Sequence, residues 1–135
     1  MLVLENARLL IIDDHADTRI LLTFVLELEG AEAIAMGSAI AALAALKCLQ
    51  ADVIISLHAD MDGYALMREV MACEVTQCKL VPAIALTGSG DADGHQLALS
   101  VGFDQCLYKP VEPDQLVADV VDLILSNRDT RHISA

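Results

Sequence analysis

Short apolar runs and segments with helical spacing alternate along the whole chain. Short runs of mainly apolar residues predict strands at 9–12, 31–36, 53–56, 83–86 and 105–108, and the run at 53–56 is rich in β-branched residues. Segments with helical periodicity predict helices at 18–28, 39–49, 64–72, 91–100 and 113–126. Gly30 ends the first helix, Ser38 is the expected N-cap of the second, and Pro113 begins the last one. In the first helix, Leu21, Leu22, Val25 and Leu28 form the expected buried face.

This order predicts an α/β fold. Strands joined by helices form right-handed crossovers and therefore a parallel sheet. The chain is 56% hydrophobic but has only two Phe, two Tyr and no Trp, so its core must be built from aliphatic residues. We expect one domain over residues 1–127 and a polar, frayed tail over 128–135.

The net charge of the chain limits the kinds of partner that it is expected to bind. The net charge is −12 with only 8 Lys and Arg, which argues against a nucleic-acid-binding surface. No apolar run reaches the roughly 18–20 residues of a transmembrane helix. No basic segment precedes the first apolar run, so we expect no signal peptide, a cytoplasmic location and no membrane partner.

Polar side chains follow several of the predicted strands. Asp13 and Asp14 come after the first strand, Thr87 ends the fourth and Lys109 follows the fifth. Sites in parallel sheets form at the carboxyl ends of strands, so these groups are expected to meet there. Two adjacent carboxylates repel each other, and a hard cation such as Mg²⁺ would offset that cost. The alternative is that Asp14 or Asp17 caps the first helix while Asp13 is merely solvated.

The third strand ends differently, within the stretch ADVIISLHADMDGYAL at 51–66. The residue at its carboxyl end is Leu57, whose side chain has no acid, base or nucleophile. A site is thus predicted at an edge where one of the central positions is chemically inert.

Four motifs carry a resemblance to a known family. LLIIDDHADTRILL, DVIIS with MDGYAL, VPAIALTG and VGFDQCLYKPVEPDQL resemble the receiver domain of two-component response regulators and hybrid histidine kinases. The likeness extends over about residues 7–125. It implies a flavodoxin-like (βα)₅ doubly wound sheet with strand order 2-1-3-4-5.

The resemblance also implies roles for single residues. In receivers an acid pair helps to bind Mg²⁺, and an aspartate at the end of the third strand accepts a phosphoryl group from a histidine kinase. By position, Asp13 and Asp14 match the acid pair. Thr87 and Lys109 match the hydroxyl and the amine that contact the phosphoryl oxygens.

The chain departs from the family pattern at two places. After the third strand, receivers have D-x-x-M-P-x-x-D-G, whereas this chain has the shorter LHADMDG, from Leu57 to Gly63. Aligned on the strand, Leu57 takes the acceptor position; aligned on Asp62-Gly63, Ile55 takes it, and neither is an acid. The switch position, usually aromatic, is Cys106.

We therefore expect a pseudo-receiver that acts by protein–protein interaction without phosphorylation at the usual position and is not an enzyme. The alternative is a phosphoaccepting receiver that uses the displaced Asp60. A Mg²⁺-dependent hydrolase of another α/β family is disfavoured, because no nucleophile remains beside the acid pair. Mg²⁺ binding should be weak, and Lys109 should pair with Asp13 or Asp14. The resemblance places the partner face, for a histidine kinase, hybrid kinase module or effector, at about residues 91–125.

Overall fold

A computed structural model describes residues 3–46, 50–57, 81–87, 96, 99–100, 102–108 and 111–134 of the chain. The strands are β1 (Arg8–Ile12), β2 (Glu32–Met36), β3 (Val53–Leu57), β4 (Ala83–Thr87) and β5 (Gln105–Tyr108). The helices are α1 (Ala16–Leu28), α2 (Ala39–Leu46) and α6 (Pro113–Ser134). All the strands predicted from the sequence are confirmed to within one residue at each end. The helix predicted at 64–72 lies outside the described residues, and the one at 91–100 is described only at Gln96, Leu99 and Ser100, which are helical.

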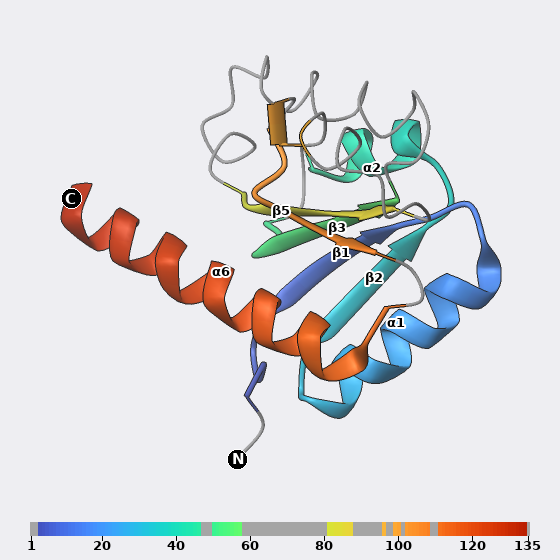
Figure 1. Ribbon diagram of the computed structural model, residues 1–135, viewed down its shortest axis with the longest axis horizontal. Helices are drawn as coiled ribbons and strands as arrows, with labels where there is room; N and C mark the ends of the chain where they lie inside the picture. The colour runs from blue at the N-terminus through green and yellow to red at the C-terminus, as the bar shows by residue number, and fades with distance from the viewer. Residues whose placement is uncertain are drawn as a thin grey trace.

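The strands form one parallel sheet with the order β2-β1-β3-β4-β5. Figure 1 shows α1 and α6 on one face of this sheet and α2 on the other. The predicted flavodoxin-like α/β fold is therefore confirmed. Because all strands run the same way, their carboxyl ends share one edge, where a site is expected.

Alternate residues of each strand face the two helical layers. Leu9, Ile11, Val53 and Ile55 pack into one buried cluster together with side chains of α1 and α6. The residues between them belong to a second buried cluster on the other face, in which Ala42 of α2 and Phe103 also pack. Burial on both faces explains why the sequences of the central strands β1, β3 and β4 are almost continuously apolar.

Local signals at the helix ends are mostly confirmed. The Ser38 hydroxyl accepts a hydrogen bond from the backbone N–H of Ala41, 3.2 Å away, as an N-cap does. Gly30 ends the first helical segment with a positive φ of 93°. The end of α6 differs from the prediction, because the helix continues to Ser134 instead of stopping near residue 126. No Gly or Pro follows Pro113 in the sequence, so no residue there forces the helix to end.

The predicted apolar face of α1 is only partly correct. Leu22 and Leu26 are the buried residues of this helix, whereas Leu21 and Leu28 are exposed. Apolar residues occur all around α1, so the spacing alone left the buried side ambiguous. None of the described helices is long and apolar enough to cross a membrane.

Two aspartates tie neighbouring strands together at the amino-terminal edge of the sheet. Asp52 precedes β3, and its side chain accepts a hydrogen bond of 2.7 Å from the backbone N–H of Arg8. Asp104 precedes β5 and accepts one of 2.8 Å from the backbone N–H of Ala83. Each aspartate also donates its own N–H to the carbonyl of the same partner. These reciprocal pairs satisfy the first backbone groups of β1 and β4.

Replacing Asp104 tests this arrangement. We expect Asp104→Ala to lower the free energy of unfolding by about 1–2 kcal/mol, because the N–H of Ala83 loses its acceptor. Asp104→Asn still offers a side-chain oxygen as an acceptor and should lower the free energy of unfolding by less. Urea unfolding followed by circular dichroism measures both. Asp122→Ala, at an exposed position of α6, is the control. Equal unfolding free energies for Asp104→Ala and Asp122→Ala would contradict the assignment.

Candidate functional site

The pairing of the strands fixes which residues stand level at the carboxyl edge. One continuous row across the sheet consists of Met36, Ile12, Ser56, Ala85 and Cys106. The next positions along β1 and β3 are Asp13 and Leu57, so these two residues stand at the same level on adjacent strands. Leu57 itself pairs with Leu86. The register therefore supports the alignment that places Leu57, not Ile55, beside the acid pair.

Asp13 continues the β1 ladder and then turns the chain into α1. Its N–H donates to the carbonyl of Met36 over 3.1 Å. Its side chain is fully buried, with 0% of its area exposed. One carboxylate oxygen, Oδ1, accepts the backbone N–H of His15 at 2.8 Å. The alternative that Asp13 is merely solvated is wrong, because the carboxylate is enclosed by the fold.

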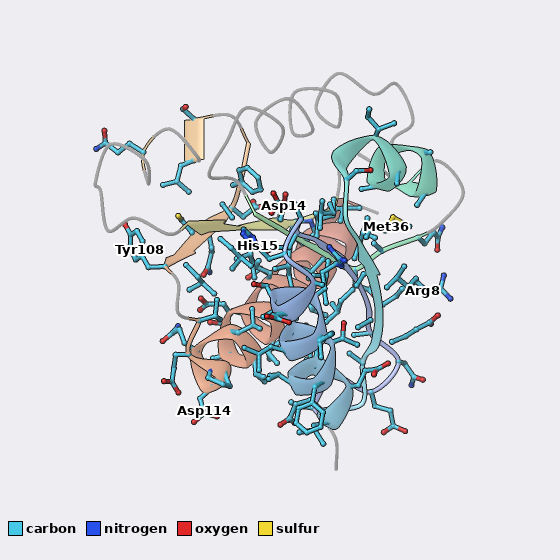
Figure 2. All side chains as sticks on the ribbon, turned by 90° about the vertical axis from the view of Figure 1, so that its right-hand side faces the viewer. Arg8, Asp14, His15, Met36, Tyr108 and Asp114 are labelled. Atoms are coloured by element: carbon cyan, nitrogen blue, oxygen red, sulfur yellow. The ribbon has the colours of Figure 1, made fainter. Side chains whose placement is uncertain are left out.

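Asp14 and His15 complete a small polar cluster at this edge. The His15 ring nitrogen Nδ1 lies 3.2 Å from Asp13 Oδ1 and 3.0 Å from Asp14 Oδ1. Both Asp14 and His15 are exposed. In Figure 2 they lie between Met36 of β2 and Tyr108 of β5. The N-cap residue of α1 is His15, which makes no side-chain capping bond, so the alternative in which Asp14 or Asp17 caps this helix is wrong.

Arg19 is a residue of this region that the sequence analysis missed. Its Nη1 donates a hydrogen bond of 2.6 Å to the backbone carbonyl of Asp13. A Cβ built on Gly37, just after β2, would lie 3.2 Å from the same nitrogen. Arg19 thus anchors the turn that carries the acid pair. Its one-turn spacing from His15 was visible in the sequence, but its contact with a backbone carbonyl was not.

The other predicted site residues are only partly described. Thr87 ends β4 and pairs with Tyr108, one position beyond the Leu57–Leu86 pair, so its backbone stands at the same edge. Lys109 and Asp60 lie outside the described residues. The predicted contact between Lys109 and the acid pair therefore stays a prediction. The roles of Thr87 and Lys109 toward a phosphoryl group are likewise untested.

Cys106, at the predicted switch position, lies in β5 opposite Ala85. It is partly buried and packs against the cluster on the α2 side of the sheet. Burial raises the pKa of its thiol. At neutral pH the side chain is therefore a small, neutral and mostly apolar group.

The donors at this edge fit a divalent cation in part. Ligand atoms of Asp13, Asp14 and His15 all lie within 4.8 Å of one another. Two carboxylates offer the hard oxygen atoms that Mg²⁺ prefers, and a bound ion would supply positive charge against their repulsion. Among the described residues, no further carboxylate joins them. His15 Nδ1 already contacts both carboxylates and would compete with a cation for the same oxygen atoms.

The fold and the acidic edge together define a flavodoxin-like α/β protein with a site at the carboxyl ends of its strands. The chain matches the family model of the response regulator receiver domain over residues 9–121 and belongs to this family. It is thus a receiver domain of a two-component signalling system. Receiver domains typically bind Mg²⁺ and interact with histidine kinases.

The relatives agree with this assignment. The chain is 38% identical over 122 residues to an uncharacterized 14.6 kDa protein of Leptolyngbya boryana, covering 87% of this chain and 89% of that protein. It is 32% identical over 123 residues to the DNA-binding response regulator MtrA of Mycobacterium leprae, covering 90% of this chain and 53% of MtrA. The chain therefore spans about half the length of MtrA.

Solved structures give the same result. The chemotaxis response regulator CheY4 of Vibrio cholerae superimposes with a TM-score of 0.78 at 27% identity, covering 87% of this chain and 98% of CheY4. A putative response regulator from Chloroflexus aurantiacus superimposes with a TM-score of 0.82 at 29% identity, covering 88% of this chain and 98% of that protein. Both are similar over almost their whole length.

Measuring Mg²⁺ affinity tests how strongly Leu57 weakens metal binding at this site. We expect weak or undetectable Mg²⁺ binding, because in the alignment on the strand Leu57 takes the position at which receivers carry a carboxylate beside the acid pair. Leu57→Asp should tighten binding by about tenfold or more, equal to ~1.4 kcal/mol. Titration by calorimetry or by ¹⁵N NMR measures both proteins, with Asp14→Ala as the control that removes a ligand. Tight binding to the unaltered chain that disappears in Asp14→Ala would contradict this expectation.

Proposed function

We propose that this receiver domain acts as a pseudo-receiver: it signals through protein contacts and is not phosphorylated at the usual position. The observation that carries the proposal is the register, which sets Leu57 level with Asp13 at the carboxyl edge of adjacent strands. A leucine has no oxygen with which to form an acyl phosphate. On this proposal the chain has no autophosphorylation activity and is not an enzyme.

Physical requirements of phosphoryl transfer support this function. The reaction depends on placing the acceptor oxygen in line with the donor and on neutralising charge around it. In receivers that acceptor stands where this chain has Leu57. Loss of the acceptor therefore removes the reacting atom itself, even if Asp13, Asp14 and Thr87 remain in place.

The surroundings of Cys106 and Asp13 favour a single conformation of the site that does not depend on phosphorylation. Cys106 has neither the ring nor the hydroxyl of the usual switch residue, and it is a partly buried residue that packs against the apolar cluster on the α2 side of the sheet. Asp13 already has hydrogen-bonding partners without a phosphoryl group or a metal. A partner would then recognise a permanent surface instead of a phosphorylation-dependent one.

A displaced acceptor is the second candidate. Asp60 comes three residues after Leu57 and is the first carboxylate of the following loop. In this candidate, the shortened loop returns Asp60 toward the acid pair. The carboxylate of Asp60 would have to lie in line with the phosphoryl donor, although it starts from a position that the family does not use for the acceptor. We therefore favour the pseudo-receiver.

Incubation with acetyl phosphate and Mg²⁺, followed by intact-mass analysis, tests the proposal. We expect no mass increase of one phosphoryl group, because no acceptor stands beside the acid pair. A phosphorylatable receiver treated in parallel is the positive control. A phosphoryl adduct that disappears in Asp60→Asn but persists in Leu57→Ala would overturn the pseudo-receiver in favour of the displaced acceptor.

The complementary experiment places an aspartate at position 57. We expect Leu57→Asp alone to leave the protein unphosphorylated under the same conditions, because the loop after β3 is still two residues shorter than the family pattern. Phosphorylation of Leu57→Asp would mean that the shorter loop tolerates the reaction and that the side chain alone decides it.

A further inference from the structure

One histidine adds a nitrogen donor to the acid pair at the carboxyl edge of the sheet. Nδ1 of His15 lies 3.2 Å from Asp13 Oδ1 and 3.0 Å from Asp14 Oδ1. Within the described part of the chain, the ligand atoms of these three residues all lie within 4.8 Å of one another. The donor set at this edge is therefore two carboxylate oxygens and one imidazole nitrogen, not oxygen alone.

These separations suit the donors of a single cation. Two ligands at right angles around an ion with bonds of about 2.1 Å are about 3.0 Å apart. The contacts from the ring nitrogen to the two carboxylates have this spacing, and the remaining pair of oxygens lies within 4.8 Å. One ion can thus contact all three side chains after only small side-chain adjustments.

The turn between β1 and α1 holds these donors and leaves them accessible. The backbone N–H of His15 donates to Asp13 Oδ1 at 2.8 Å, and Arg19 holds the Asp13 carbonyl at 2.6 Å. Hydrogen bonds of this kind orient metal ligands. The side chains of Asp14 and His15 are 61% and 68% exposed, and an open hollow of about 440 Å³ lies against His15 and the first turn of α1. A cation therefore has a route from solvent, and water can fill its remaining coordination positions.

The imidazole determines which cation fits best. Mg²⁺ prefers oxygen donors and has to displace the ring of His15 from the two carboxylates. A first-row transition ion such as Co²⁺ or Ni²⁺ binds imidazole as well as carboxylate. For such an ion the ring that competes with Mg²⁺ becomes a ligand, in the tautomer whose proton is on Nε2.

We propose that Asp13, Asp14 and His15 bind a divalent transition-metal ion in preference to Mg²⁺, with His15 Nδ1 as a direct ligand. In the alignment on the strand, Leu57 takes the position of a further carboxylate, and the ring nitrogen supplies a third donor instead. A bound ion would join the end of β1 to the N-cap residue of α1. The proposal does not depend on phosphorylation, so it can fail or hold independently of the pseudo-receiver assignment.

Titrations of the full chain with Co²⁺, Mn²⁺ and Mg²⁺ test the proposal. Mn²⁺ favours oxygen donors and so reports the carboxylates, whereas Co²⁺ also reports the imidazole. Calorimetry gives the dissociation constants, and we expect Co²⁺ to bind at least about tenfold more tightly than Mg²⁺. His15→Ala should weaken Co²⁺ binding by about tenfold or more and Mn²⁺ binding by less, because only Co²⁺ gains strongly from the ring. His15→Asn, which offers an oxygen near the place of Nδ1, should likewise lose the preference for Co²⁺.

A matched control separates this site from binding to other side chains. His132→Ala removes an imidazole from the far end of α6 and should change none of the dissociation constants. His15 makes no side-chain capping bond, so we expect His15→Ala to fold like the unaltered chain, which circular dichroism checks.

Three results would overturn the proposal. Equal losses of Co²⁺ and Mn²⁺ affinity in His15→Ala would mean that the ring only positions the carboxylates. Unchanged Co²⁺ affinity in His15→Ala, with absorption typical of thiolate ligands, would place the ion on cysteines. Binding of Mg²⁺ as tight as that of Co²⁺ would show that the imidazole does not select the cation.

Discussion

The carboxylate of Asp13 is enclosed at the carboxyl end of a central strand, and a buried negative charge must be hydrogen-bonded or paired. The turn into α1 meets this condition: the backbone N–H of His15 donates to Asp13, and the His15 ring stands beside both acids. Arg19 in turn holds the Asp13 carbonyl, which fixes the path of the backbone. The start of α1 is therefore positioned by the same contacts that accommodate the acid.

The leucine at the end of β3 changes the electrostatics of this edge. A carboxylate at position 57 would stand level with Asp13 on the adjacent strand and add a third negative charge, which would favour a bound cation. With Leu57 there, fewer acids repel one another, and we expect less free energy to be gained by binding Mg²⁺. If Leu57 takes the place of the phosphoryl acceptor, as we propose, then the loss of the acceptor and the weaker binding of the metal have the same physical cause.

The sequence was sufficient for the sheet because its signals are local and redundant. The three central strands, β1, β3 and β4, are short, mainly aliphatic runs bounded by polar or turn residues. Ser38 and Gly30 mark their helix ends through their own side-chain or backbone chemistry. The position of Asp13 at the edge could be predicted in the same way. Its burial and the contact with Arg19 could not, because both depend on how α1 lies across the end of β1. The end of α6 was missed because a helix without a stop residue has no local end signal.

Arg19 connects the acid pair to the body of α1. Its guanidinium donates a hydrogen bond of 2.6 Å to the carbonyl of Asp13, and a Cβ built on Gly37, just after β2, would lie 3.2 Å from the same nitrogen. The backbone N–H of His15, the N-cap residue of α1, donates to the carboxylate of the same aspartate. Because the first residues of one helix hold both the carbonyl and the carboxylate of Asp13, a shift of α1 would move the acid pair with it.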